Sequence, residues 1–166
     1  MYISIRNQVS RLALVALALL SSACVTTTET VFTEKASPEK ALERRVELAR
    51  NYVGEGDWEN AKRNLKLAYE IDPDNAEVHE AFALVYQSTG EFEMAEESFK
   101  TAIRLDKNFS RARNNYAAFL YSLERYDEAE KQLEFVVQDT LYEGRPRAFV
   151  NLCLCRRKLF DSQGAE

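Results

Sequence analysis

The sequence contains few of the residues that build catalytic or metal sites. Its 166 residues include one histidine, three cysteines and one tryptophan. It has no glycine-rich phosphate loop, no pair of histidines or cysteines at metal-ligand spacing and no nucleophile elbow. The sequence therefore predicts no catalytic residue, no metal, no cofactor and no small-molecule substrate, and we do not expect an enzyme.

Glycine, proline and surplus positive charge are also scarce. Five glycines and three prolines argue against long loops, and the formal net charge is −5. Nucleic-acid binding needs clustered lysine and arginine to contact phosphates, so an acidic chain of this kind is a poor candidate for it. A hydrophobic fraction of 46%, with 11% aromatic residues, is enough to build a packed core.

The main feature that is present is one pattern repeated three times between residues 42 and 141, with a period of 34 residues. Aromatic and small residues return at the same positions in each unit. The matching sets are Tyr52, Tyr86 and Leu120; Trp58, Phe92 and Tyr126; Ala61, Ala95 and Ala129; and Ala68, Ala102 and Val136.

Each unit is typical of two amphipathic helices. In the first unit, apolar residues recur at helical spacing from Leu42 to Val53 and again from Trp58. Gly56 suits the turn between the helices, Asp57 can cap the second helix, and Pro73 ends it. One such hairpin cannot bury its own apolar face, so the units must stack on one another.

These residues resemble the tetratricopeptide repeat in type and spacing. The resemblance implies an all-α fold, a tetratricopeptide-repeat superhelix or α-solenoid, with three repeats over 39–143 and the first helix of an incomplete fourth repeat over 144–166. Lys107 and Leu141 replace the expected prolines, and Glu124 replaces the turn glycine. We expect these departures to blur the helix ends without changing the fold.

The last helix raises two questions that the sequence leaves open. It belongs either to a truncated array or to a cap, and its apolar residues favour truncation over a cap, which needs a polar outer face. Cys153 and Cys155 point about 200° apart on a helix and cannot share a metal. Cys153 stands at the small-residue position of the repeat, which predicts a packed thiol, with a disulfide to another chain as the alternative. A second copy of the chain could also pair with residues 147 to 160.

The first 38 residues differ from the rest. Arg6 and Arg11 precede the apolar run 12–20, and small residues then lead to Cys24. Residues 1–23 thus predict a signal peptide, and the small residues before Cys24 resemble the lipobox of bacterial lipoproteins. That resemblance implies acylation of Cys24, against an ordinary cleaved signal with a free thiol. The threonine-rich residues 24–38 predict a flexible tether, with Ser37 capping the first helix.

In tetratricopeptide arrays the first helices of successive units line a groove that binds peptides or helices. Transferred by repeat position, this resemblance implies a partner-binding groove in the present chain. The predicted groove residues are Arg50, Leu84, Gln87, Asn114, Ala118 and Tyr121, with Val46, Val53 and Glu80 at further groove-facing positions. His79 falls where the repeat packs against the adjacent helix, so we expect a packing role.

A narrower resemblance covers residues 24 to about 160. The segments Asn114-Asn115-Tyr116 and Gln138-Asp139-Thr140-Leu141-Tyr142 are not required by the generic repeat. They resemble type IV pilus biogenesis and stability lipoproteins, the pilotin family called PilF or PilW. The resemblance implies a non-enzymatic outer-membrane lipoprotein, anchored on the periplasmic side, that binds the pilus secretin and promotes its localisation and multimerisation. The alternative is a lipid-anchored periplasmic scaffold that recruits cell-wall or other envelope proteins.

Overall fold

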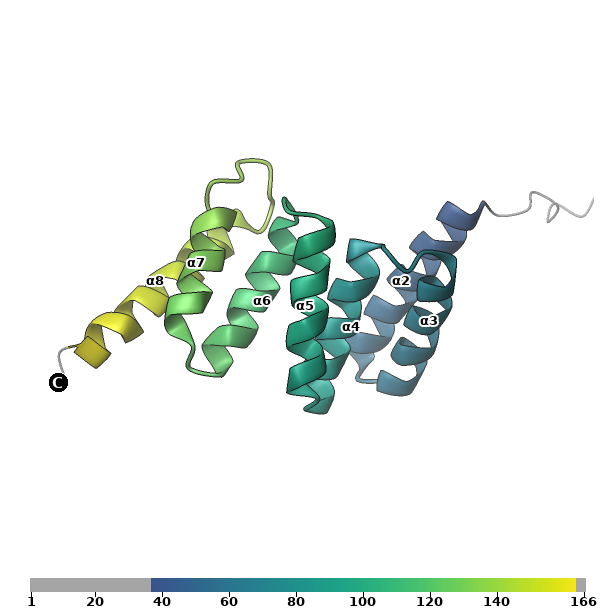
Figure 1. Ribbon diagram of the computed structural model, residues 1–166, viewed down its shortest axis with the longest axis horizontal. Coiled ribbons are helices and arrows are strands. Elements are labelled where there is room, and N and C mark those ends of the chain that lie inside the picture. Colours follow the sequence, from purple (N-terminus) through teal and green to yellow (C-terminus); the bar gives the residue numbers. More distant parts are fainter. Residues whose placement is uncertain (1–36, 164–166) are drawn as a thin grey trace, which may run out of the picture. The chain divides into compact units, whose positions relative to one another are not determined.

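The computed structural model describes residues 37–163, with the side chains of 37–161. Within that range the chain forms seven helices and no strand (Figure 1). None of these helices is both long and apolar enough to cross a membrane. The predicted signal peptide, Cys24 and most of the predicted tether lie outside the described residues. The helices are α2 (Pro38–Glu55), α3 (Trp58–Ile71), α4 (Ala76–Thr89), α5 (Phe92–Leu105), α6 (Ser110–Ser122), α7 (Tyr126–Val136) and α8 (Arg145–Gln163).

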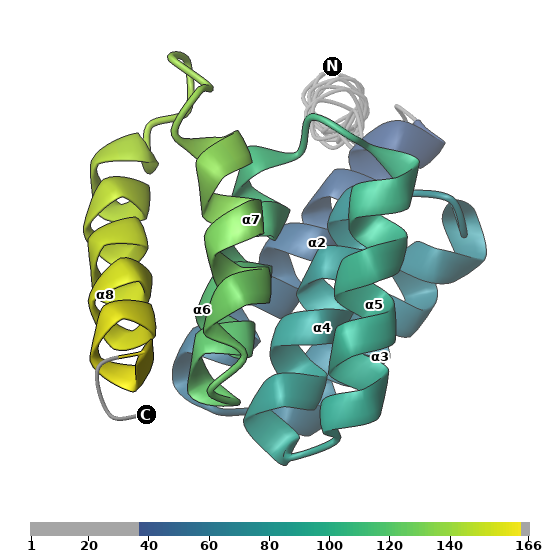
Figure 2. The ribbon, with the colours of Figure 1, turned by 60° about the vertical axis from the view of Figure 1, so that its left-hand side comes forward.

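The helices pair as the 34-residue period predicts. α2 packs on α3, α4 on α5 and α6 on α7, and each pair is one repeat unit. α8 contacts α7 and α6, which is the place expected for the first helix of a fourth unit (Figure 2). The predicted all-α tetratricopeptide-repeat superhelix is therefore confirmed.

The helix starts follow local capping chemistry. Ser37 Oγ accepts a hydrogen bond of 3.3 Å from the backbone N–H of Lys40, and α2 begins at Pro38. Asp57 Oδ1 accepts one of 3.1 Å from the backbone N–H of Asn60 and caps α3 as predicted. These bonds satisfy backbone donors that the first turn of a helix leaves unpaired.

The expected blurring of the helix ends does not occur at Lys107. α5 ends at Leu105, just as α3 ends at Ile71, although only α3 is followed by a proline. The reason is Asp106, whose Oδ1 accepts a hydrogen bond of 2.9 Å from the backbone N–H of Asn108. The carboxylate closes a local turn and stops the helix without proline.

The first and second helices of the units form two distinct layers. α2 contacts α4, α4 contacts α6, and α6 contacts α8. By contrast, the Cα atoms of α3, α5 and α7 do not come within 8 Å of one another. Because the first helices lie closer together than the second helices, the described array curves toward the first helices. We call the surface formed by α2, α4, α6 and α8 the inner face.

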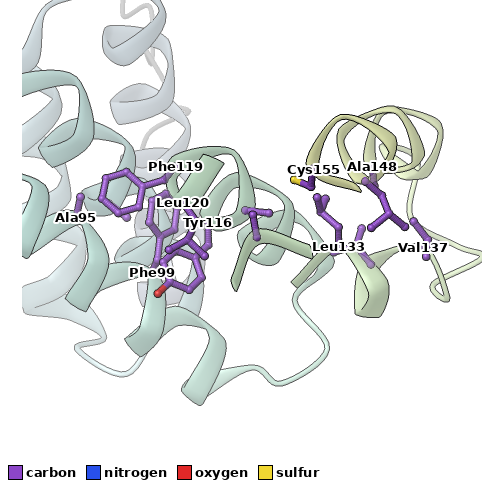
Figure 3. Close-up of a cluster of buried hydrophobic side chains, with 14 residues drawn as sticks. Ala95, Phe99, Tyr116, Phe119, Leu120, Leu133, Val137, Ala148 and Cys155 are labelled. Carbon is purple, nitrogen blue, oxygen red and sulfur yellow. The ribbon is translucent and has the colours of Figure 1, made fainter. Parts of the chain in front are cut away.

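The core confirms the predicted register. The alanines at equivalent positions, Ala61, Ala95 and Ala129, are all completely buried. The largest cluster, which includes Ala95 and Ala129, joins α4 to α8, and Figure 3 shows Phe99 and Phe119 toward one end of it and Ala148 and Val137 at the other. The ring centroids of Phe99 and Phe119 lie 5.8 Å apart, within the range at which aromatic pairs attract. Small and aromatic residues therefore interlock the units.

Candidate protein-binding groove

A buried ion cluster occupies the middle of the inner face. Glu80, on α4, is fully buried, and its Oε2 lies 2.8 Å from Nη2 of Arg50 on α2. Its Oε1 accepts a hydrogen bond of 2.7 Å from Nδ2 of Asn115 on α6. A buried carboxylate needs such compensation, because its transfer out of water is costly. The cluster therefore links the first helices of three successive units.

Arg111, on α6, adds a second cation to this cluster. Its Nη2 lies 3.3 Å from Oε2 of the exposed Glu77, and its Nε lies 3.8 Å from Oε2 of Glu80. The Nε and Nη2 atoms of Arg111 are nonetheless buried and donate no hydrogen bond within the described part of the chain. The nearby Tyr142 hydroxyl has a raised pKa, chiefly because it is buried. Arg111 thus lies beside two carboxylates, while its side chain is still 39% exposed.

Asn114 and its neighbours connect helices rather than face an open groove. The Oδ1 of Asn114 accepts a hydrogen bond of 3.3 Å from Nδ2 of Asn151 on α8, and Asn114 is only 6% exposed. Asn115 donates to Glu80, and the hydroxyl of Tyr116 donates to Glu96 on α5 at 3.1 Å. Each of these consecutive residues, which carry part of the narrower resemblance, therefore bonds to a different helix.

A small cavity opens between α6 and α8 on the inner face. It measures about 90 Å³, and its lining is mostly apolar. Two predicted groove residues line it: Ala118 is exposed, and Tyr121 is half-buried with its ring against Tyr126 at 5.1 Å between centroids. The other lining residues are Ala117, Leu133, Asn151, Leu154 and Cys155. The structure thus brings Ala118 and Tyr121 together at one concave site.

The remaining predicted groove residues lie on the same face but are partly used internally. Arg50 pairs with Glu80, and Leu84 packs at the edge of the main core cluster. Gln87 is half-buried near the end of α4. Partner binding by the predicted set stays a prediction, and Ala118 is the exposed member of that set.

The ion cluster could have been found from the sequence. Arg111 follows the acidic residue Glu77 by one repeat period, so opposite charges occupy the same position in neighbouring units. First helices of neighbouring units lie side by side in this fold, so such residues are close in space. The repeat position of Glu80 predicts a groove-facing residue, whereas in the structure Arg50 and Asn115 enclose its carboxylate.

The structure confirms the predicted packing role of the histidine but not the predicted burial of Cys153. His79 packs as expected, because its ring forms a T-shaped contact with Tyr69 of α3 at 5.8 Å between centroids. The prediction that Cys153 is the packed thiol is wrong: Cys153 is exposed, and Cys155 is buried. The small-residue position packs against the second helix of its own unit, and the described chain has no helix there to cover Cys153. Cys155 instead faces the core cluster, and its burial raises the pKa of its thiol.

A separate ion pair joins α5 and α7, the second helices of the second and third units. Arg125, at the start of α7, donates two hydrogen bonds to Glu96, from Nη1 at 2.7 Å and from Nη2 at 2.9 Å. These charge-assisted bonds lower the pKa of Glu96 to about 2. Burial, together with the same carboxylate, raises the pKa of the Tyr116 hydroxyl. The two-pronged contact fixes the third unit against the second.

Comparisons with known proteins agree with this architecture. A tetratricopeptide-repeat family model matches residues 39–75 and 76–109. The type IV pilus assembly protein PilF of Pseudomonas aeruginosa is 40% identical over 116 residues, which cover 70% of this chain and 46% of PilF. A solved structure of Pseudomonas aeruginosa PilF has a TM-score of 0.72 at 38% identity, covering 74% of this chain and 55% of that one.

A further solved structure is PilW, described as a widely conserved type IV pilus biogenesis factor. It has a TM-score of 0.69 at 25% identity and covers 74% of this chain and 56% of PilW. The chain thus spans about half the length of the relatives that it matches. The matches and the stacked helical hairpins show a tetratricopeptide-repeat protein that is homologous to the type IV pilus proteins PilF and PilW.

Proposed function

We propose that this chain is a pilotin: a lipid-anchored, non-enzymatic protein that binds a segment of the pilus secretin and promotes its outer-membrane localisation and multimerisation. The observation that carries the proposal is the 40% identity to the pilus assembly protein PilF over 116 residues. The inner face supports it, because a curved layer of helices with a small apolar cavity suits a protein segment rather than a substrate.

In this proposal, residues 1–23 direct export and are removed, and Cys24 then carries the lipid. Each buried CH₂ of an acyl chain contributes about 0.8 kcal/mol, so several chains anchor a protein firmly. The segment that follows Cys24 spaces the repeats from the periplasmic surface of the outer membrane. No cofactor takes part, and the groove supplies the partner contacts.

The experiment compares secretin in cells that carry the gene, lack it, or express Cys24→Ala. Cys153→Ala is the matched control, because Cys153 is an exposed cysteine on α8 outside the predicted lipobox. Membrane fractionation and unheated gels locate the secretin and detect its rings. We expect outer-membrane rings with the wild-type chain and with Cys153→Ala, and inner-membrane subunits with the deletion and with Cys24→Ala.

Unchanged rings in the deletion strain would refute the pilotin role. Pull-downs from envelope extracts would then test the scaffold role. Cell-wall hydrolases or synthases captured without secretin would favour it.

A further inference from the structure

The side chain at one repeat position changes the inner face from unit to unit. Arg50, Leu84 and Ala118 are separated by one period each and occupy the same place on α2, α4 and α6. Arg50 fills this place by pairing with Glu80, and Leu84 fills it by packing on the core. Ala118 is too short to do either, and the cavity lies beside it. The opening therefore follows from a small residue at a position that is filled in the other two units.

The cavity has the size and polarity for one aliphatic side chain. An apolar cavity of about 150 Å³ holds a benzene molecule, so a cavity of about 90 Å³ suits a side chain such as leucine or valine better than an aromatic ring. Leu154 and Tyr121 supply apolar walls. Asn151 is already hydrogen-bonded to Asn114 and does not need a polar partner in the cavity.

Positive charge lies on the same face of α6. Arg111 precedes Ala118 by seven residues, two turns of helix, which places the two about 10 Å apart along the axis. The Arg111 side chain is 39% exposed, although its Nε and Nη2 are buried beside Glu80 and Glu77. The charge of the exposed Arg147, in the first turn of α8, also reaches Tyr142 beside Arg111. Glu77 and Glu80 are both paired with Arg50 and Arg111, whereas Arg147 forms no ion pair among the described residues.

We propose that the inner face between α6 and α8 binds an extended protein segment with one aliphatic residue in the cavity and an aspartate or glutamate on Arg111. An extended segment in the polyproline II conformation advances about 3.1 Å per residue and presents every third side chain on the same face, so the acidic residue lies three residues from the aliphatic one. The carboxylate pairs with Arg111, whose side chain is 39% exposed, and charge-assisted contacts are stronger than neutral ones. This inference rests on the proposed protein-binding function but not on the secretin as the partner.

The test uses two sets of immobilised peptides and the purified full chain. The first set contains designed 12-residue peptides of serine and glycine with a glutamate three residues from a leucine. Its controls carry lysine in place of glutamate, or serine in place of leucine. The second set contains overlapping segments of the periplasmic part of the pilus secretin.

Two variants probe the site itself. Ala118→Leu fills the cavity with the residue that the second unit already carries at this position, so the fold has a precedent for it. Arg111→Gln removes the charge but leaves Glu80 paired with Arg50. The matched control is Arg63→Gln, an exposed arginine on the outer helix α3.

We expect the glutamate–leucine peptide to bind at least tenfold more tightly than either control peptide. Ala118→Leu should weaken this binding at least tenfold, Arg111→Gln about threefold to tenfold, and Arg63→Gln not at all. Equal binding of the lysine peptide, an unaffected Ala118→Leu variant, or no binding of the designed peptides would overturn the proposal. A dimer of the wild-type chain that Ala118→Leu dissociates, measured by sedimentation, would also overturn the proposal. The occupant of the cavity would then be a second copy of the chain.

The two peptide sets separate this inference from the proposed function. If secretin segments bind and Ala118→Leu does not weaken their binding, the pilotin role stands and this site is rejected. If the designed peptides bind, and bind more weakly to Ala118→Leu and Arg111→Gln as expected, while secretin segments do not bind, the site stands. That result counts against the secretin as the partner.

Discussion

Replacing Glu124 with glycine should stabilise the protein. Glu124 has a φ of +62° in the turn between α6 and α7, and it is the one non-glycine residue of the described chain with a positive φ. Gly56 and Gly90 hold the same place in the first two units, with φ values of +76° and +80°. A left-handed conformation costs a side-chain-bearing residue about 1–2 kcal/mol. Against this, glycine makes the unfolded chain more flexible, which costs about 0.5–1 kcal/mol.

The backbone around Glu124 requires no rearrangement. Its N–H donates to the carbonyl of Tyr121 at 3.0 Å, as the N–H of Gly56 donates to Val53 at 3.2 Å. Glu124→Gly therefore keeps these bonds and removes only the strain. We expect the free energy of unfolding to rise by about 0.5–1 kcal/mol, the difference between the two costs. For a chain of this size that corresponds to about 1–4 °C in Tm.

Urea unfolding followed by far-UV circular dichroism measures this change. The matched reverse variant is Gly90→Ala, where an added Cβ would meet no atom within 4 Å, so that only the backbone conformation is penalised. We expect Gly90→Ala to lower the free energy of unfolding by about 1 kcal/mol. The reasoning is refuted if Glu124→Gly leaves stability unchanged or lowers it, or if both variants shift it in the same direction.

Two further predictions concern titration and thiol reactivity. The pKa of Glu96 is about 2 in the folded protein, below its ordinary 4.5, so its pairing with Arg125 stabilises fully above pH 4.5 and is lost as pH falls toward 2. The difference in free energy of unfolding between wild type and Glu96→Gln, measured by urea unfolding, should therefore shrink as the pH falls across that range. A difference that stays constant with pH would contradict this. The control variant is Glu93→Gln, which replaces an exposed glutamate on the same helix. For the thiols, iodoacetamide followed by peptide mass spectrometry should modify the exposed Cys153 rapidly and the buried Cys155 only on unfolding. Equal rates in the folded protein would show that α8 does not hold its place.

Much of the fold could be predicted because the period fixes which residues face inward. The alanines one period apart are buried wherever three units stack, and no information beyond the repeat is needed to place them. Even Glu124 could be assigned to the turn position, because the two earlier units carry glycine there. Local chemistry then set the helix starts at Ser37 and Asp57.

The candidate site was less predictable, because it depends on contacts between units. Repeat position places Asn114 and Ala118 on the same face, yet only the packing of α8 decides that Asn114 is covered and Ala118 remains open. The cysteines show the same dependence. Helical spacing separates Cys153 from Cys155 correctly, but which of them is buried depends on the neighbouring helices.

The contact of each helix with only its own and adjacent units has a consequence for how the protein opens. α2 touches α3 and α4, and α8 touches α6 and α7, whereas α4 has neighbours on both sides. In such an array local unfolding begins at the units with fewest neighbours and spreads inward. Amide protons of α4 should therefore exchange with solvent most slowly, and those of α2 and α8 most rapidly. A partner segment that bridges α6 and α8 would slow exchange in α8 first, giving a readout of binding that needs no assay of pilus assembly.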